Sequence, residues 1–187
     1  MFKFKAKDFL AIPNILSYFR IILVFVFLFV YQQEMQHKSL CMGIILIASG
    51  ISDALDGYIA RKYNMITELG KCLDPIADKL TQFVLLICLL TKYPVAKAIL
   101  FIFVIKEILV TIMGYKAICI QGKNEGAKWY GKLSTIIFYV VTIVLVLFVD
   151  MDIQIGNILL GISGIAILIA FIGYMKLYVS VILKSYK

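Results

Sequence analysis

Six long apolar runs follow one another along the chain, and short segments between them hold most of the polar residues. A helix of about 20 apolar residues crosses the roughly 30 Å hydrocarbon core of a bilayer, so each run predicts a transmembrane helix. The predicted helices cover residues 12–31, 40–60, 70–90, 95–118, 129–149 and 153–181. The pattern therefore predicts an all-α, polytopic membrane protein with a single membrane-embedded domain over residues 1–187.

Composition supports this class, because hydrophobic residues make up 63% of the 187 residues and charged residues only 16%. Mean hydropathy is +0.98. A soluble domain of this length would have too few polar residues to cover its core, whereas helices that face lipid need none. The basic segment 1–11 is expected to lie along the membrane surface, and the apolar run after it to stay as the first helix rather than act as a signal peptide.

The distribution of Lys and Arg predicts the orientation in the membrane, since cytoplasmic loops carry an excess of these residues. Basic residues near the predicted helix ends are abundant on the side shared by both termini and sparse on the other, where they are Lys38, Lys92 and Lys97. The protein is therefore expected in the cell (plasma) membrane, with both termini on the cytoplasmic side. The formal net charge of +8 is explained by this topology together with anionic head groups or a phosphate-bearing substrate, so no nucleic acid partner is expected.

Cysteine and histidine are too sparse for several kinds of site. The four cysteines are scattered without a C-x2-C pair, and His37 is the only histidine. The cysteines are expected to be small buried hydrophobic residues. The sequence thus argues against a histidine-based zinc centre and against a Ser-His hydrolase.

Four aspartates gather at the end of the second predicted helix and the start of the third. They belong to the pattern Asp53-x2-Asp56-Gly57-x2-Ala60-Arg61-x8-Gly70-x3-Asp74-x3-Asp78. The first pair is spaced i and i+3 and the second i and i+4, so each pair emerges from one face of its helix. Charges in membrane helices are costly and usually functional, which disfavours a purely structural role for the whole set. Because proline is best tolerated in a first turn, the third helix is expected to begin near Pro75, at the cytoplasmic mouth.

Facing carboxylates repel one another unless cations lie between them. A site whose ligands are all oxygen atoms, with no Cys or His, favours hard ions, so the pattern predicts Mg²⁺ or Mn²⁺. Two such ions about 3.5 to 4 Å apart would form the clamp used in phosphoryl transfer. The small residues Gly57, Ala60 and Gly70 would let a bulky group approach, and the guanidinium of Arg61 suits a phosphate.

This pattern resembles the signature of the CDP-alcohol phosphatidyltransferases, and each signature position has its matching residue here. The resemblance implies a six-helix membrane enzyme, often a homodimer, that moves a phosphatidyl group from CDP-diacylglycerol to an alcohol and releases CMP. It also implies that two divalent ions bind the diphosphate and that Asp78 is the general base. The implied metal ligands are Asp53, Asp56, Asp74 and Asp78, and the residues around the CDP moiety are Gly57, Ala60, Arg61 and Gly70.

The first half of the chain, including residues 12–14, 19–20, 60–64 and 73–79, is similar to members that use glycerol 3-phosphate as acceptor. An anionic acceptor needs cationic partners, and the candidates are Lys79, Lys106, Lys128 and Lys132. The pair Lys106 and Glu107 would equally suit a structural ion pair between helices.

Three alternatives stay open, because Gly114 and Ser134 stand where members that use glycerol 3-phosphate carry basic residues. The acceptor could be phosphatidylglycerol, giving cardiolipin, or another alcohol of the same family. A divalent-cation transporter would also place aspartates in membrane helices. The acids gather near one membrane face and no inverted repeat is apparent, which disfavours the transporter.

Overall fold

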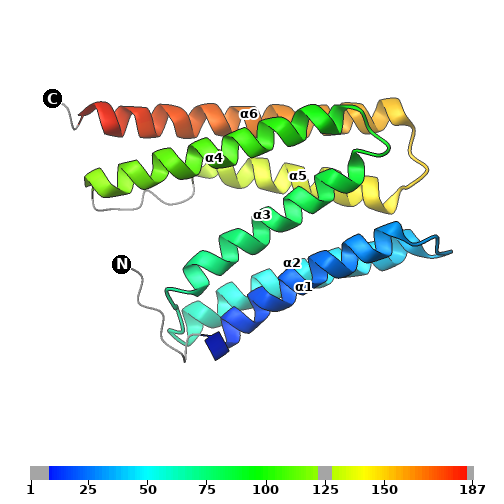
Figure 1. Ribbon diagram of the computed structural model, residues 1–187, viewed down its shortest axis with the longest axis horizontal. Helices are drawn as coiled ribbons and strands as arrows, with labels where there is room; N and C mark the ends of the chain where they lie inside the picture. The colour runs from blue at the N-terminus through cyan, green and yellow to red at the C-terminus, as the bar shows by residue number, and fades with distance from the viewer. Residues whose placement is uncertain (1–8, 122–127, 185–187) are drawn as a thin grey trace. The chain divides into compact units, whose positions relative to one another are not determined.

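The computed structural model describes residues 9–121 and 128–184, and every regular element within them is helical (Figure 1). The helices are α1 (Ile12–Gln32), α2 (Lys38–Lys62), α3 (Gly70–Leu89), α4 (Val95–Gln121), α5 (Trp129–Leu147) and α6 (Ile153–Lys184). No helix end differs from the predicted residue ranges by more than three residues, so the all-α prediction is confirmed. The proposed interfacial segment 1–11 lies almost entirely outside the described residues.

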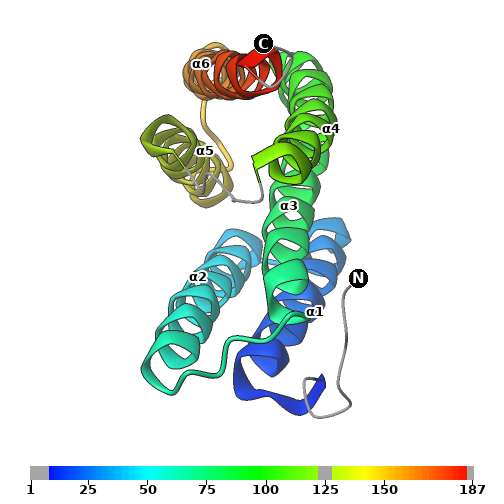
Figure 2. The same ribbon diagram turned by 90° about the vertical axis from the view of Figure 1, so that its left-hand side faces the viewer.

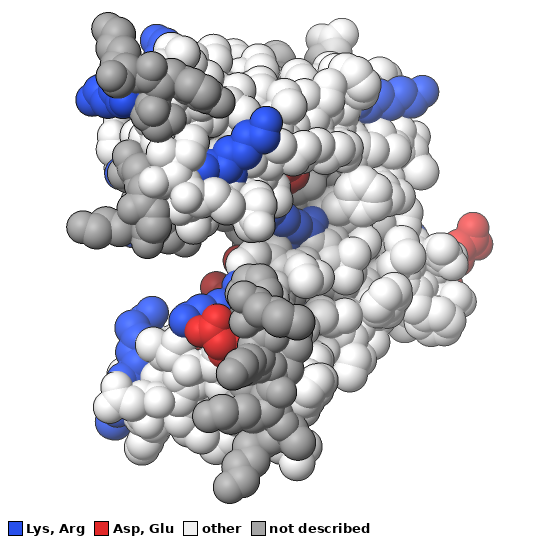
Figure 3. Space-filling view, turned by 60° about the vertical axis from the view of Figure 1, so that its left-hand side comes forward, with Lys and Arg blue, Asp and Glu red and all other residues white. Residues whose placement is uncertain are grey.

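Four of the described helices, α1, α2, α5 and α6, are long and apolar enough to cross a membrane. Together with the six-helix arrangement they indicate a polytopic membrane protein. Most of the surface visible in Figure 3 carries neither acidic nor basic side chains, as contact with lipid requires. The crossing of the membrane by α3 and α4 stays a prediction.

Two compact units make up the chain (Figure 1). The first holds α1, α2, nearly all of α3 and the short segment Val146–Val149, and the second holds α4, α6 and most of α5. All four aspartates of the acidic pattern belong to the first unit. The expectation of a single domain stays a prediction.

In the first unit, α1 packs against α2. Two hydrogen bonds show that α3 runs parallel to α1. Ser17 donates to Asp74 near the start of both helices, and the Tyr31 hydroxyl donates to the Cys88 carbonyl oxygen (2.6 Å) near their ends. Both contacts join residues 57 positions apart. The start of α1, the end of α2 and the start of α3 therefore share one end of this unit.

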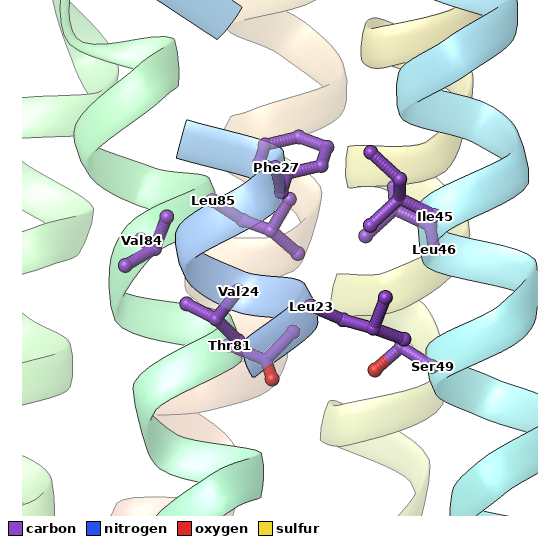
Figure 4. A pocket seen from close by; sticks show the side chains of 9 residues that line it. All are labelled: Leu23, Val24, Phe27, Ile45, Leu46, Ser49, Thr81, Val84 and Leu85. Carbon is purple, nitrogen blue, oxygen red and sulfur yellow. The ribbon is translucent and has the colours of Figure 1, made fainter. Parts of the chain in front are cut away.

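The core of the first unit is apolar where the three helices meet. Figure 4 shows a small pocket lined by side chains of α1, α2 and α3, among them Phe27, Leu46 and Leu85, which are buried. Burial of such side chains supplies the main stabilising term in water, and close packing supplies it in lipid. This core fixes the register that carries the polar residues to the common end.

The start of α3 differs from the expectation, because the helix begins at Gly70 and Pro75 lies inside it. Thr67 provides the start, since its hydroxyl accepts a hydrogen bond from the Gly70 N–H (2.9 Å) and its carbonyl accepts one from the Lys71 N–H (3.2 Å). This cap satisfies donors that a first helical turn leaves unpaired. The expected start near Pro75 was therefore wrong, and Asp74 lies within the helix.

In the second unit, α4 and α6 lie side by side (Figures 1 and 2). Glycines of α6 meet large side chains of the same unit, as Gly173 does with Tyr130 and Gly164 with Ile99. At the start of α6, the Asp152 carboxylate accepts hydrogen bonds from the Gln154 N–H (2.8 Å) and the Ile155 N–H (3.3 Å). The small residues thus serve helix packing, and an acidic cap begins the last helix.

Candidate functional site

The end of α2 presents the first two aspartates at different depths. The Asp53 side chain is 54% exposed, whereas that of Asp56 is 5% exposed. Ala60, one turn further along, is half-buried. The helix ends at a turn in which Asn64 adopts a left-handed conformation (φ 52°), which asparagine tolerates better than most residues. This turn leads directly to Thr67 and the start of α3.

Arg20 of α1 lies among three of the four carboxylates. Its Nη1 contacts Asp53 Oδ1 at 2.6 Å and also donates to Asp78 Oδ1, and its Nη2 donates to Asp56 Oδ2 at 2.5 Å. The Arg20 side chain is only 2% exposed, while that of Asp78 is 47% exposed. One buried guanidinium therefore joins α1, α2 and α3 at the acidic end of the first unit.

Asp74 has a different partner. The buried Ser17 hydroxyl donates a hydrogen bond to Asp74 Oδ1 at 2.6 Å. A hydrogen bond to a carboxylate is about twice as strong as one between neutral groups. Ser17 therefore fixes the orientation of Asp74 from the same helix that carries Arg20.

A polar stripe on α1 supplies these contacts, and the sequence analysis did not assign it a role. Asn14, Ser17 and Arg20 are spaced three residues apart and are all buried in an otherwise apolar helix. On α2, the Ser52 hydroxyl donates to the Leu16 carbonyl oxygen (3.1 Å), so small polar residues also line the facing helix. The signal that could have revealed the stripe is the Arg within an apolar span, since such charges usually mark functional sites.

The expected substrate-binding residues have close neighbours in the first unit. A side chain at Gly57 would meet the Arg61 guanidinium at 3.4 Å, so Arg61 lies over this glycine. A Cβ at Gly70 would lie 2.6 Å from Asn14 Oδ1 and 3.1 Å from Thr67 Oγ1. Asn14 also donates to the Thr67 hydroxyl (2.9 Å). Gly70 thus lets α3 approach α1, whatever its part in binding substrate.

Replacement of Gly70 by Ala is expected to lower the melting temperature, because the added methyl group must displace Asn14 from its bond to Thr67. Overpacking of this kind costs about 1 to 3 kcal/mol. Gly50→Ala is the matched control, since among the described residues no atom beyond the local helix backbone lies within 4 Å of a Cβ at Gly50, and alanine favours the helix. Thermal unfolding of both variants in detergent measures the difference, and equal melting temperatures would contradict the role given to Gly70.

The acidic residues fit a divalent ion by their donor chemistry. Among the described residues, no group of three or more Asp, Glu, His or Cys side chains is arranged to hold a metal ion as the structure stands, with Arg20 among three carboxylates. Their ligand atoms are nevertheless all carboxylate oxygens, which Mg²⁺ and Mn²⁺ prefer. Three of them already converge on one positive charge, and Asp74 lies one turn before Asp78 on α3. Ligation by these four residues stays a prediction.

The four lysines expected to bind the acceptor do not belong to one unit. Lys79 follows Asp78 in the first unit, whereas Lys106, Lys128 and Lys132 belong to the second. Lys106 contacts Glu107 at 2.5 Å, with both side chains largely buried (14% and 17% exposed). Both residues belong to α4, so this ion pair lies within one helix, and the alternative of a pair between helices stays open. Lys132 is exposed at the start of α5, and the Lys128 N–H donates to the Tyr174 hydroxyl (3.2 Å).

Curated relatives carry a common description. The chain is 36% identical over 100 residues to the CDP-diacylglycerol–glycerol-3-phosphate 3-phosphatidyltransferase of Rickettsia bellii, a match that covers 54% of this chain and 55% of the relative. Proteins of the same description from Haemophilus influenzae and Escherichia coli are 30% identical over 129 residues and 26% identical over 132 residues. These two matches cover 66% of this chain and 69% and 70% of the relatives. The chain thus spans about half the length of the Rickettsia protein.

A family model matches nearly the whole chain. The match runs over residues 10–181, which include all six helices except the last turn of α6. It contains the four aspartates, Arg20 and the small residues of the acidic pattern. The chain therefore belongs to the CDP-alcohol phosphatidyltransferase family.

Proposed function

We propose that the chain transfers a phosphatidyl group from CDP-diacylglycerol to glycerol 3-phosphate, giving phosphatidylglycerophosphate and CMP in phospholipid biosynthesis. The observation that carries the proposal is the convergence of Asp53, Asp56 and Asp78 on one buried positive charge, with Asp74 on the same helix as Asp78. The relatives named for this reaction and the family match support it. Phosphatidyl transfer needs a site that binds a diphosphate and deprotonates an alcohol, and these residues supply both.

Asp78 is proposed as the general base. It accepts the proton of the acceptor hydroxyl while the acceptor oxygen forms a bond to the phosphorus of the phosphatidyl group. The bond from that phosphorus to the CMP oxygen breaks, and CMP leaves with the electron pair. The partial exposure of Asp78 lets a polar acceptor reach it. Base catalysis of this kind typically contributes about 10²- to 10⁴-fold.

Members of the family generally use a divalent metal. We propose two ions, Mg²⁺ or Mn²⁺, with Asp53, Asp56, Asp74 and Asp78 as ligands. When bound, such ions neutralise the charge on the transferring phosphoryl group. The protein's part is to hold the four carboxylates at one end of three helices and to orient Asp74 through Ser17.

The CDP moiety is proposed to lie at Gly57, Ala60, Arg61 and Gly70. The Arg61 side chain is exposed and lies over Gly57, so its guanidinium is accessible to a phosphate. For the acceptor phosphate we propose Lys79, Lys106, Lys128 and Lys132. Lys106 is the weakest of these candidates, since Glu107 already neutralises it.

The site is proposed to face the cytoplasm in a plasma-membrane protein. Arg61 and Lys62 in the last turn of α2 support this orientation, because basic residues at helix ends favour the cytoplasmic side. Lipid substrate would enter sideways from the leaflet, and soluble acceptor from the water. A homodimer with one domain per chain is the proposed assembly.

Release of CMP by the purified chain in detergent tests the proposal. CDP-diacylglycerol and Mg²⁺ are supplied with one acceptor at a time: glycerol 3-phosphate, phosphatidylglycerol, inositol phosphate or serine. Release specific to glycerol 3-phosphate is expected. Release with phosphatidylglycerol alone would move the chain to cardiolipin synthesis, and the absence of release with every acceptor would contradict the enzymatic function and favour a cation transporter.

A further inference from the structure

We propose that Arg20 is a positioning residue that holds Asp53, Asp56 and Asp78 together in the metal-free protein and competes with divalent cations for their oxygens. This inference rests on the proposed function insofar as the carboxylates bind metal. It assigns a role to a residue outside the acidic pattern, on a helix that contributes no carboxylate.

The contacts of Arg20 reach both helices that carry the aspartates. Asp53 and Asp56 belong to α2 and Asp78 to α3, and each is in direct contact with the same guanidinium from α1. A guanidinium carries a permanent charge and five N–H donors in a rigid fork, which allows several carboxylates to bind at once. Without it, two helices would present their carboxylates to one another with no cation between them, and these charges repel.

The charge of this cluster leaves room for further cations. Three carboxylates and one guanidinium leave the cluster with a net charge of −2, although Arg20 is almost completely buried. A single arginine therefore holds the cluster together without neutralising it. A divalent cation attracted to the remaining charge needs the same carboxylate oxygens that Arg20 now contacts, so the two cannot both keep their full set of contacts.

The guanidinium is also incompletely satisfied where it lies. Its Nε is buried and makes no hydrogen bond to any residue that the structure describes. A buried N–H donor without an acceptor is unfavourable. The Arg20 side chain would therefore gain stability from a position in which Nε also has an acceptor. A side chain bound strongly through its two Nη atoms but unsatisfied at Nε can leave when a better cation arrives.

Two measurements on the purified full chain in detergent test this competition. The first is the dissociation constant for Mn²⁺, from the electron paramagnetic resonance signal of the free ion. The second is the melting temperature in EDTA and in saturating Mn²⁺. Arg20→Gln is expected to bind Mn²⁺ more tightly, on the order of tenfold, because a competing charge within contact distance is removed. It should melt lower than the unmodified chain in EDTA and gain more on adding Mn²⁺.

Lys71→Gln is the matched control, since it also removes one positive charge, three residues before Asp74 on α3. Lys71 pairs with Glu68 at 2.6 Å on the exposed surface, so a near-normal Mn²⁺ affinity and Mn²⁺-dependent rise in melting temperature are expected. The Mn²⁺ affinity of Arg20→Lys, and its rise in melting temperature on adding Mn²⁺, should lie between those of the unmodified chain and of Arg20→Gln. The reason is that one ammonium group cannot bridge three carboxylates as the forked guanidinium does. If Arg20→Gln does not fold, the same two measurements on Arg20→Lys test the competition between Arg20 and Mn²⁺.

The outcomes separate this inference from the proposed function. Arg20→Gln could instead bind Mn²⁺ no more tightly than the unmodified chain, with its melting temperature lowered by the same amount in EDTA and in Mn²⁺. Arg20 would then be a structural residue, and the proposed competition with metal would be wrong. If the unmodified chain shows no saturable Mn²⁺ binding that depends on Asp53, the metal centre itself is wrong and both proposals fall. Tighter binding together with a larger Mn²⁺-dependent rise supports the competition.

Discussion

Asp78→Asn is expected to reduce the rate of CMP release by about 10²- to 10⁴-fold, the range that a lost general base typically costs. The amide has nearly the shape of the carboxylate but cannot accept the proton of the acceptor hydroxyl. It would also weaken the contact with Arg20, which now donates to Asp78 Oδ1. Because the Asp78 side chain is 47% exposed, the folded structure should tolerate the change better than a change at the buried Asp56.

The matched control for this substitution is Asp152→Asn. Asp152 caps α6 by accepting hydrogen bonds from the Gln154 and Ile155 N–H groups, and asparagine caps helices nearly as well. The control should therefore keep both melting temperature and CMP release. Both variants are assayed with CDP-diacylglycerol and glycerol 3-phosphate at saturating Mg²⁺. Residual activity in Asp78→Asn within a few-fold of the control would contradict its role as the base.

The helices and the pairing of aspartates follow from the sequence, because both depend on local spacing. Apolar runs of membrane-spanning length locate all six helices, and the i and i+3 spacing places Asp53 and Asp56 on one face of α2. The prediction that α3 begins near Pro75 was wrong, and the reason is equally local. Thr67 caps the helix at Gly70, and Pro75 is accommodated in its second turn.

The role of Arg20 does not follow from the sequence in the same way. Its three partners lie between 33 and 58 residues further along the chain, and these contacts exist only because α1, α2 and α3 pack in one register. Spacing within one helix says which residues share a face but not which face meets which. The close fit of Gly70 against Asn14 depends on the same register, and it was expected to serve substrate instead. For the acceptor lysines, the sequence supplied candidates but no positions in space.

Chelation of divalent metal is expected to abolish CMP release from the unmodified chain while leaving its helical content unchanged. The physical reason lies in the charge of the cluster formed by Arg20, Asp53, Asp56 and Asp78, which is −2. A site of that charge repels the diphosphate of the proposed substrate, so binding should fail along with catalysis. The helices should persist, because Arg20 and the apolar core of the first unit continue to join α1, α2 and α3.

The assay compares CMP release in EDTA with release in the same amount of EDTA already saturated with Mg²⁺, which controls for effects of the chelator on detergent or lipid. Circular dichroism of the same samples reports helical content. Adding excess Mg²⁺ or Mn²⁺ to the chelated sample should restore the rate, since ions with a preference for oxygen ligands fit the carboxylates. Full activity in EDTA would contradict the metal centre, whereas lost activity that no added ion restores, together with lost helix signal, would indicate unfolding rather than removal of a catalytic ion. Recovery with an intact helix signal throughout would tie the chemistry to a bound divalent ion rather than to the stability of the bundle.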